Sequence, residues 1–153
     1  MDFDRLDRAV SRLMRRWGVP ALRLSLGVVF IWFGLLKPLG ISAAEPLVLA
    51  TVRWLPAGDP GGWVGLIGWW EVAIGIGFLI PGAVRVAIAL LALQMVGTFL
   101  PLVVLPEVAF QPGRVPYAPS MEGQYIIKNL LIISAALVVG GTVRSGDQER
   151  AAG

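Results

Sequence analysis

The chain has 153 residues, of which 56% are hydrophobic and only 15% are charged, and its mean hydropathy is +0.74. Soluble domains carry about 25% charged residues, and a small domain cannot bury this much apolar surface in one core. The composition therefore argues against a soluble globular protein and predicts a membrane protein. The absence of Cys and His excludes disulfides, thiol redox chemistry and histidine-ligated haem or zinc within this chain.

Four apolar segments approach the length of about 20 residues that a helix needs to cross a bilayer. They lie at 21–36, 63–80, 84–105 and 124–143, and Pro or Gly stands at their ends. The predicted fold is therefore an all-α membrane protein, a four-transmembrane-helix bundle. We expect a single membrane domain over 1–143, followed by a polar C-terminal tail at 144–153.

Three shorter segments flank these spans. Residues 1–20 are charged, and their apolar residues at helical spacing predict an amphipathic N-terminal helix on the membrane surface. Those apolar residues are Leu6, Val10, Leu13 and Trp17. Residues 41–54 are apolar but too short to span, which predicts an interfacial or a re-entrant segment between the first two spans. Residues 106–123 are rich in Pro and Gly, which predicts an ordered loop or a cap over the bundle.

The basic residues predict the orientation. Those before and at the start of the first span are Arg5, Arg8, Arg12, Arg15, Arg16 and Arg23. An even number of spans puts both termini on one side, which would also hold Arg85, Arg144 and Arg150. The other side would hold only Lys37, Arg53, Arg114 and Lys128. Because cytoplasmic loops are enriched in Lys and Arg, we predict that both termini are cytoplasmic. The sequence pI of about 10 then reflects topology and not nucleic-acid binding.

Ionisable groups inside a bilayer cost a few kcal/mol or more, so the few in these spans are candidates for function. Glu71 is the deepest, Lys37 ends the first span and Lys128 lies in the first turns of the fourth. Lys37 shares a helix face with Gly27 and Gly34, and small residues allow close helix approach. We therefore predict a ligand-binding pocket in the outer half of the bundle. Its predicted residues are Lys37, Trp69, Trp70, Glu71, Gln94, Thr98, Lys128 and Asn129, with Glu107, Glu122 and Tyr125 at the mouth.

The same residues also fit a purely structural interpretation, which the sequence leaves open. A Lys–Glu pair between helices can serve only to fix helix register. Both lysines can extend to the outer interface. Gln94 and Asn129 can serve as hydrogen-bonding groups between helices. No catalytic residue and no metal site are predicted.

Three phrases carry a resemblance to a known family. RLSLGVVFIWFGLLKP, GWWEVAIGIGFLIPG and EGQYIIKNLLIISAALVVG, in this order over roughly 20–143, resemble the DoxX-like family of four-helix bacterial membrane proteins, nearest the reactive-chlorine resistance branch of the inner membrane. The positions that match its pattern are Arg23, Gly34, Lys37, Glu71, Thr98 and Lys128. The family includes membrane subunits of thiosulfate:quinone oxidoreductase and proteins linked to oxidative stress. Because this chain lacks Cys, it cannot carry a sulfur substrate covalently.

The resemblance and the residues together favour a small subunit that binds a quinone or another lipophilic ligand in membrane redox or oxidative-stress defence. Glu71 would supply an acid/base group, Lys37 and Lys128 cationic donors, and Trp69 and Trp70 flat walls. No cofactor is expected to be covalently bound, and quinone is the candidate ligand. The chain offers no flavin or metal site, so a partner would supply electrons and the chain is not expected to be an enzyme by itself.

Two alternatives remain from the sequence. The first is a small-solute transporter or permeation protein, and the second is a non-catalytic assembly or anchor subunit of a membrane complex. The expected partners are the lipid bilayer and either a second copy of the chain or a membrane redox protein, with no nucleic acid. The expected location is the bacterial plasma membrane.

Overall fold

The structure is a computed structural model that describes residues 3–53 and 59–151, with side chains described as far as Val143. It is all-helical in these residues apart from one isolated bridge between Phe110 and Pro119. Its helices are α1 (Phe3–Leu36), α2 (Glu45–Val52), α3 (Pro60–Leu79), η1 (Pro81–Ala83), α4 (Val84–Phe99), α5 (Pro101–Val104), α6 (Pro106–Ala109) and α7 (Met121–Ala151). Four helical stretches are long and apolar enough to cross a membrane: Phe3–Leu36, Pro60–Leu79, Pro81–Val104 and Met121–Val143.

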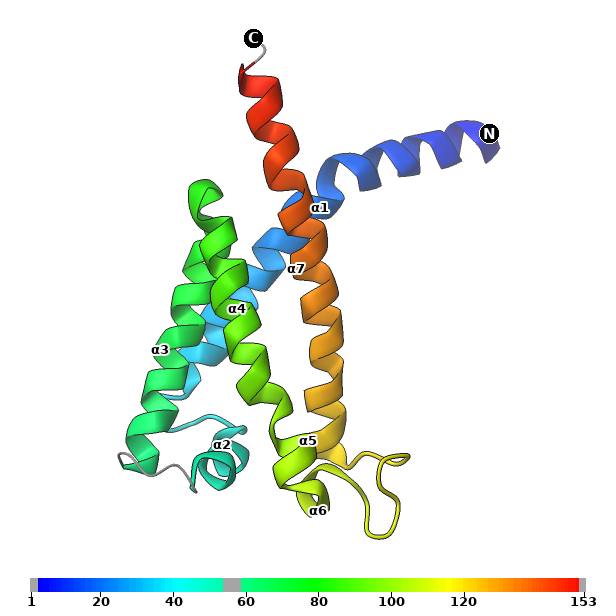
Figure 1. The fold of residues 1–153 in the computed structure, drawn as a ribbon. Helices are drawn as coiled ribbons and strands as arrows, with labels where there is room; N and C mark the ends of the chain where they lie inside the picture. The colour runs from blue at the N-terminus through cyan, green and yellow to red at the C-terminus, as the bar shows by residue number, and fades with distance from the viewer. Residues whose placement is uncertain (1–2, 54–58, 152–153) are drawn as a thin grey trace.

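The four long helices form a ring. Helix α1 lies between α3 and α7, and α4 completes the ring between the same two helices (Figure 1). The start of α1 and the end of α7 lie at one end of the bundle, as expected for an even number of crossings. Large apolar side chains such as Trp32, Val96 and Leu131 are exposed on the outside. Monomeric soluble proteins rarely expose so much contiguous apolar surface, so this exterior suits contact with a lipid bilayer.

The predicted spans match the long helices, with three differences at their ends. The predicted surface helix at 1–20 and the first span are one continuous helix, α1, with Pro20 inside it. The third span is divided at Pro101, because proline lacks an N–H and its ring clashes with the preceding turn. Helix α7 continues through Ala151, so the predicted polar tail at 144–153 is helical over most of its length.

The described residues between the spans form short helices and a bridged loop. The predicted segment 41–54 contains α2, which lies against α3, while Trp54 falls outside the described residues. The predicted loop or cap at 106–123 begins with α6 and continues through the bridged loop into α7. Ser120 links α6 to the start of α7, because its hydroxyl donates to Val108 O at 2.5 Å and accepts from the Gly123 N–H at 3.1 Å.

The bundle is packed at the end that holds the termini. The core there is built from Leu26, Phe30, Ile74, Phe78, Val84, Ala87, Leu91, Met95, Ala136 and Val139. Arg23 reinforces the same end, because its guanidinium donates to the carbonyls of Phe78 and Leu79 at the end of α3. A helix C-terminus leaves carbonyls without intrahelical partners and favours a cation. Arg23, which we expected to act as a topology determinant, therefore also caps α3.

Helices α1 and α3 meet at two pairs of glycines. A Cβ added to Gly75 would lie 2.7 Å from Gly27 O, and one added to Gly68 would lie 2.6 Å from Gly34 O. These separations leave no room for a side chain. The predicted glycine face of the first span therefore packs against two glycines of α3, Gly68 and Gly75. We call this contact the glycine seam (Gly27, Gly34, Gly68 and Gly75).

We expect Gly68→Ala to destabilise the bundle, because its Cβ would meet Gly34 O on α1 and the side chains of Lys37 and Pro38 just after α1. Overpacking of this kind costs about 1–3 kcal/mol. Gly65→Ala is the matched control on the same helix, since nothing lies within 4 Å of its added Cβ. That control should leave stability unchanged or raise it by up to about 1 kcal/mol through helix propensity. The measurement is an SDS titration in mixed micelles followed by circular dichroism; equal stability of the two variants would contradict the seam.

Candidate functional site

The end of the bundle away from the termini is hollow. A cavity of about 590 Å³ lies there, bounded by α2, α3, α4, α5, α7 and the end of α1. Its volume falls in the range of about 300–1,000 Å³ that is typical of ligand sites. Most of its walls are apolar, including Leu47 and Val48 of α2, Ile67 of α3 and Ile126 of α7. It is therefore an apolar space with a small number of polar groups at defined places.

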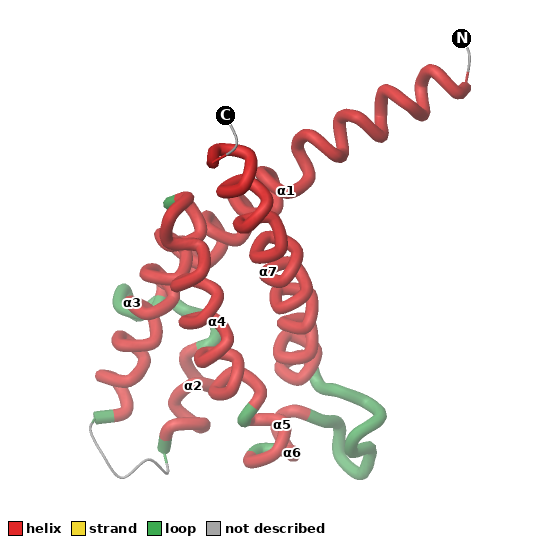
Figure 2. Tube along the Cα trace, turned by 45° about the horizontal axis from the view of Figure 1, so that its top comes forward, coloured by secondary structure: helices red, strands yellow, loops and turns green. Residues whose placement is uncertain are grey.

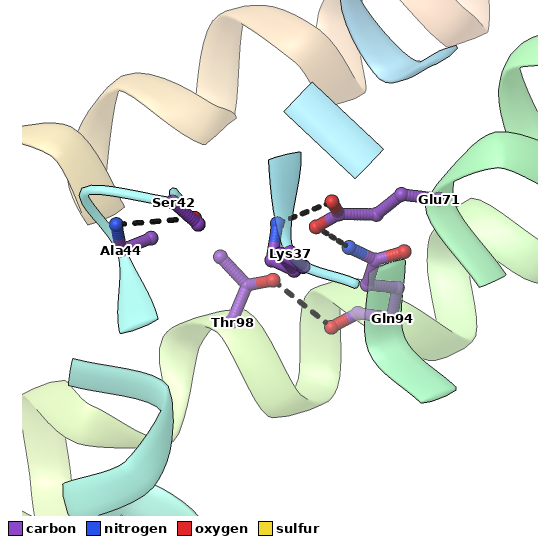
Figure 3. Close-up of polar contacts among 6 residues, drawn as sticks. All are labelled: Lys37, Ser42, Ala44, Glu71, Gln94 and Thr98. Carbon is purple, nitrogen blue, oxygen red and sulfur yellow. Dashed lines mark hydrogen bonds and ion pairs between the residues drawn. The ribbon is translucent and has the colours of Figure 1, made fainter. Parts of the chain in front are cut away.

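Three of those polar groups form one cluster, shown in Figure 3. Lys37, just after α1, pairs with Glu71 Oε2 on α3, and Gln94 Nε2 on α4 donates to Glu71 Oε1 at 2.7 Å. Both carboxylate oxygens are therefore engaged, by side chains from two different segments. The side chains of Lys37 and Glu71 are only 6% and 13% exposed. A charge removed from water to this extent requires a partner, and here each charge has the other.

The glycine seam explains why this pair forms. Lys37 lies three residues after Gly34 on α1, and Glu71 lies three residues after Gly68 on α3. The added Cβ of Gly34 would be 3.0 Å from Glu71 Cβ, and that of Gly68 would be 2.8 Å from Lys37 Cβ. The contact between the helix backbones thus brings the stems of the two charged side chains together.

The cluster has hydrogen-bonding capacity that its own contacts do not use. A lysine ammonium has three donors, and Glu71 is the one side-chain partner of the Lys37 ammonium among the described residues. Gln94 Oε1 is buried and has no hydrogen-bond partner in the described part of the chain. Thr98 lines the cavity and donates its hydroxyl proton to Gln94 O at 3.1 Å, one turn back along α4.

Two further predicted residues lie on the cavity wall. Trp70 is held by its indole N–H, which donates to Leu90 O at 3.3 Å. Asn129 uses its amide nitrogen within α7, where it donates to Tyr125 O and Ile126 O at 3.0 and 3.1 Å. Tyr125, predicted at the mouth, lines the cavity and is 64% exposed, which places it at the rim.

Four predicted residues do not line the cavity. Trp69 is 59% exposed and faces outward, because consecutive helical residues point about 100° apart and Trp70 takes the inward position. Lys128 is exposed, with its ammonium 5.2 Å from the centroid of the Tyr125 ring. Glu107 and Glu122 are exposed and lie outside the cavity lining. Of the two lysines and two tryptophans predicted for the pocket, Lys37 and Trp70 line the cavity, whereas Lys128 and Trp69 do not.

The sequence prediction also missed one wall of the cavity. Helix α2 contributes Leu47, Val48, Thr51 and Val52. Their i, i+1, i+4, i+5 spacing is that of one helix face, and it is the available signal within 41–54. The Thr51 hydroxyl donates to Leu47 O at 2.7 Å, so α2 adds little polarity to the cavity.

No group of three or more metal-binding side chains of the His, Cys, Asp and Glu types occurs among the described residues. Comparison of the chain with family models, with curated proteins and with solved structures finds no match. The function therefore has to be inferred from the cavity and its polar cluster.

We expect Lys37→Met to lower stability by roughly 3 kcal/mol or more, because it leaves the Glu71 carboxylate buried without its charge partner. The double variant Lys37→Met/Glu71→Leu should recover most of that loss, since apolar groups of similar volume can replace a buried ion pair. Lys128→Met, at an exposed lysine, is the control and should match the wild type. Denaturation in mixed micelles measures all three; a stable Lys37→Met variant would show that the pair contributes little to folding.

Proposed function

We propose that this chain is a multi-pass membrane protein that binds a lipophilic ligand with a carbonyl-bearing head group, and that the ligand is a quinone. The observation that carries the proposal is an apolar cavity of about 590 Å³ with a buried Lys37–Glu71–Gln94 cluster on its wall. Apolar pockets with a few convergent polar groups are the usual form of small-molecule sites. A pair that served only to hold two helices in register would not need a cavity beside it.

The polar cluster suits the chemistry of a quinone. Lys37 has donors beyond the one that Glu71 accepts, and these can bind a carbonyl oxygen. Glu71 can accept or release a proton beside that oxygen, and quinone reduction takes up protons together with electrons. Trp70 offers a flat aromatic surface on the same cavity wall. The electrons would come from a membrane partner, since the described residues offer no metal cluster.

We further propose that the chain is a DoxX-like protein of the bacterial plasma membrane and acts in membrane redox or oxidative-stress defence. The support is the sequence resemblance, together with the place of three of its matching residues, Lys37, Glu71 and Thr98, on the cavity wall. Lys128 matches the same pattern but lies outside the cavity, so it carries no ligand role in this proposal. The excess of arginine near both termini supports a cytoplasmic location for both.

The proposal is tested by titrating decylubiquinone into the purified chain in nanodiscs and measuring binding by calorimetry. Gly97→Leu should weaken binding by about tenfold or more, because Gly97 lines the cavity and nothing lies within 4 Å of its added Cβ. The added side chain occupies space that the ligand needs without touching the Lys37–Glu71 pair. Lys37→Met/Glu71→Leu should also weaken binding by at least tenfold, through loss of the polar contacts.

Lys128→Gln is the matched control and should bind as the wild type does, because this lysine is exposed and lies outside the cavity lining. Size-exclusion profiles identical to the wild type confirm that each variant is folded. Non-saturable binding, or equal affinity in all variants, would overturn the proposal. A membrane protein that co-purifies in stoichiometric amount with every cavity variant would favour an assembly or anchor role instead.

A further inference from the structure

The first half of α1 lies outside the cavity and contributes no residue to its lining. Residues 3–20, which we call the arm, leave the bundle sideways at the end that holds the termini (Figures 1 and 2). The arm is helical throughout and continues directly into the apolar part of α1. Pro20 lies where the arm joins the bundle, and a proline inside a helix allows a bend.

The arm has two faces of different chemistry. At about 100° per residue, its large apolar side chains fall in one stripe, and its arginines fall on the opposite side. The stripe holds Leu6, Val10, Leu13 and Trp17, all of which are exposed, Leu13 by 61% and Trp17 by 55%. The arginines of the other face include Arg8, Arg12 and Arg15. A contiguous apolar stripe that stays exposed in the folded chain marks a site of contact with a protein or a membrane.

We propose that the arm binds the surface of an anionic phospholipid bilayer, the same membrane that the bundle crosses. The apolar stripe would enter the boundary between head groups and acyl chains, and the arginines would meet lipid phosphates. Amphipathic helices with arginine on the polar face and Leu or Trp on the other bind membranes in this way. Trp17 suits the head-group level of a bilayer, where tryptophan is enriched. The Arg16 guanidinium lies 5.7 Å from the centroid of the Trp17 ring, at the edge between the apolar and the basic face.

Geometry and charge favour a lipid surface over a protein partner. Since the arm and the apolar span belong to one helix, a bilayer that the span crosses would have its surface near the root of the arm. The arm holds five arginines and two aspartates, so it carries net positive charge. Arg23 and Arg85 lie at the same end of the bundle, which adds to the positive charge there. Anionic head groups are the complementary surface that is always present at this position.

The absence of cysteine allows a direct test on the whole chain. A spin label on Leu13→Cys reports the apolar stripe, and one on Ser11→Cys reports the polar side. In nanodiscs that contain phosphatidylglycerol, we expect the Leu13 label to collide with oxygen dissolved in lipid and the Ser11 label with a water-soluble nickel chelate. In nanodiscs of phosphatidylcholine alone, the Leu13 label should become accessible to the nickel chelate as well.

The charge dependence has its own matched variants. Arg8→Gln/Arg12→Gln/Arg15→Gln should lower the ratio of bound to free arm by about fivefold for each arginine removed. Gln keeps the helix propensity of the arm. Arg53→Gln/Arg114→Gln removes two exposed charges at the opposite end of the bundle and should leave the labels unchanged. High salt should weaken the arm's binding in the wild type, as expected for exposed charges.

Two results would overturn this inference. One is nickel accessibility of the Leu13 label in the anionic nanodiscs, which would show that the stripe does not enter lipid. The other is protection of that label in detergent micelles that rises with protein concentration, which would assign the stripe to a second copy of the chain. Neither result depends on quinone binding, so the arm and the cavity are tested independently.

Discussion

The close contact between α1 and α3 is the constraint on which the rest of the structure depends. At the glycine seam the backbones approach so closely that a Cβ on Gly68 would lie 2.6 Å from Gly34 O. This approach brings Lys37 beside Glu71, and it lets Arg23 reach the carbonyls at the end of α3. In a bilayer, small residues and interhelical polar contacts supply much of the attraction between helices. The antiparallel contact between α1 and α3 therefore holds both the buried ion pair and the close glycine packing.

The bundle uses its two ends differently. At the end with the termini, apolar side chains from all four long helices fill the interior. At the other end, the segment from Pro101 and the short helix α2 border an open cavity instead of a core. The Lys37–Glu71 pair faces this hollow end. A buried pair is weak support for stability by itself, because desolvation offsets much of its attraction. Its position on a cavity wall is what favours a role in binding.

The sequence predicted the four spans well, because their length and apolar content follow directly from the bilayer thickness. It also predicted that Lys37 and the glycines share one face, because helical spacing fixes faces within a helix. It could not predict how each helix is rotated against its neighbours. Trp69 and Trp70 looked equivalent in the sequence, yet only Trp70 faces the cavity. The place of Lys128 outside the cavity lining also follows from helix rotation, and the capping role of Arg23 depends on an α3 terminus 55 residues away.

The arm and the cavity lie at opposite ends of the bundle, which has a consequence for proton exchange. With the arm on an anionic leaflet, the cavity lies in the other half of the bilayer. A proton moving between Glu71 and the arm side would have to cross the packed core that contains Phe30, Ile74 and Phe78. Those side chains offer no hydrogen-bonding groups, whereas the cavity side holds Lys37, Gln94 and Thr98. If the proposed ligand binds beside Glu71, a proton that Glu71 exchanges with it would therefore come from, and return to, the side of the membrane opposite the arm.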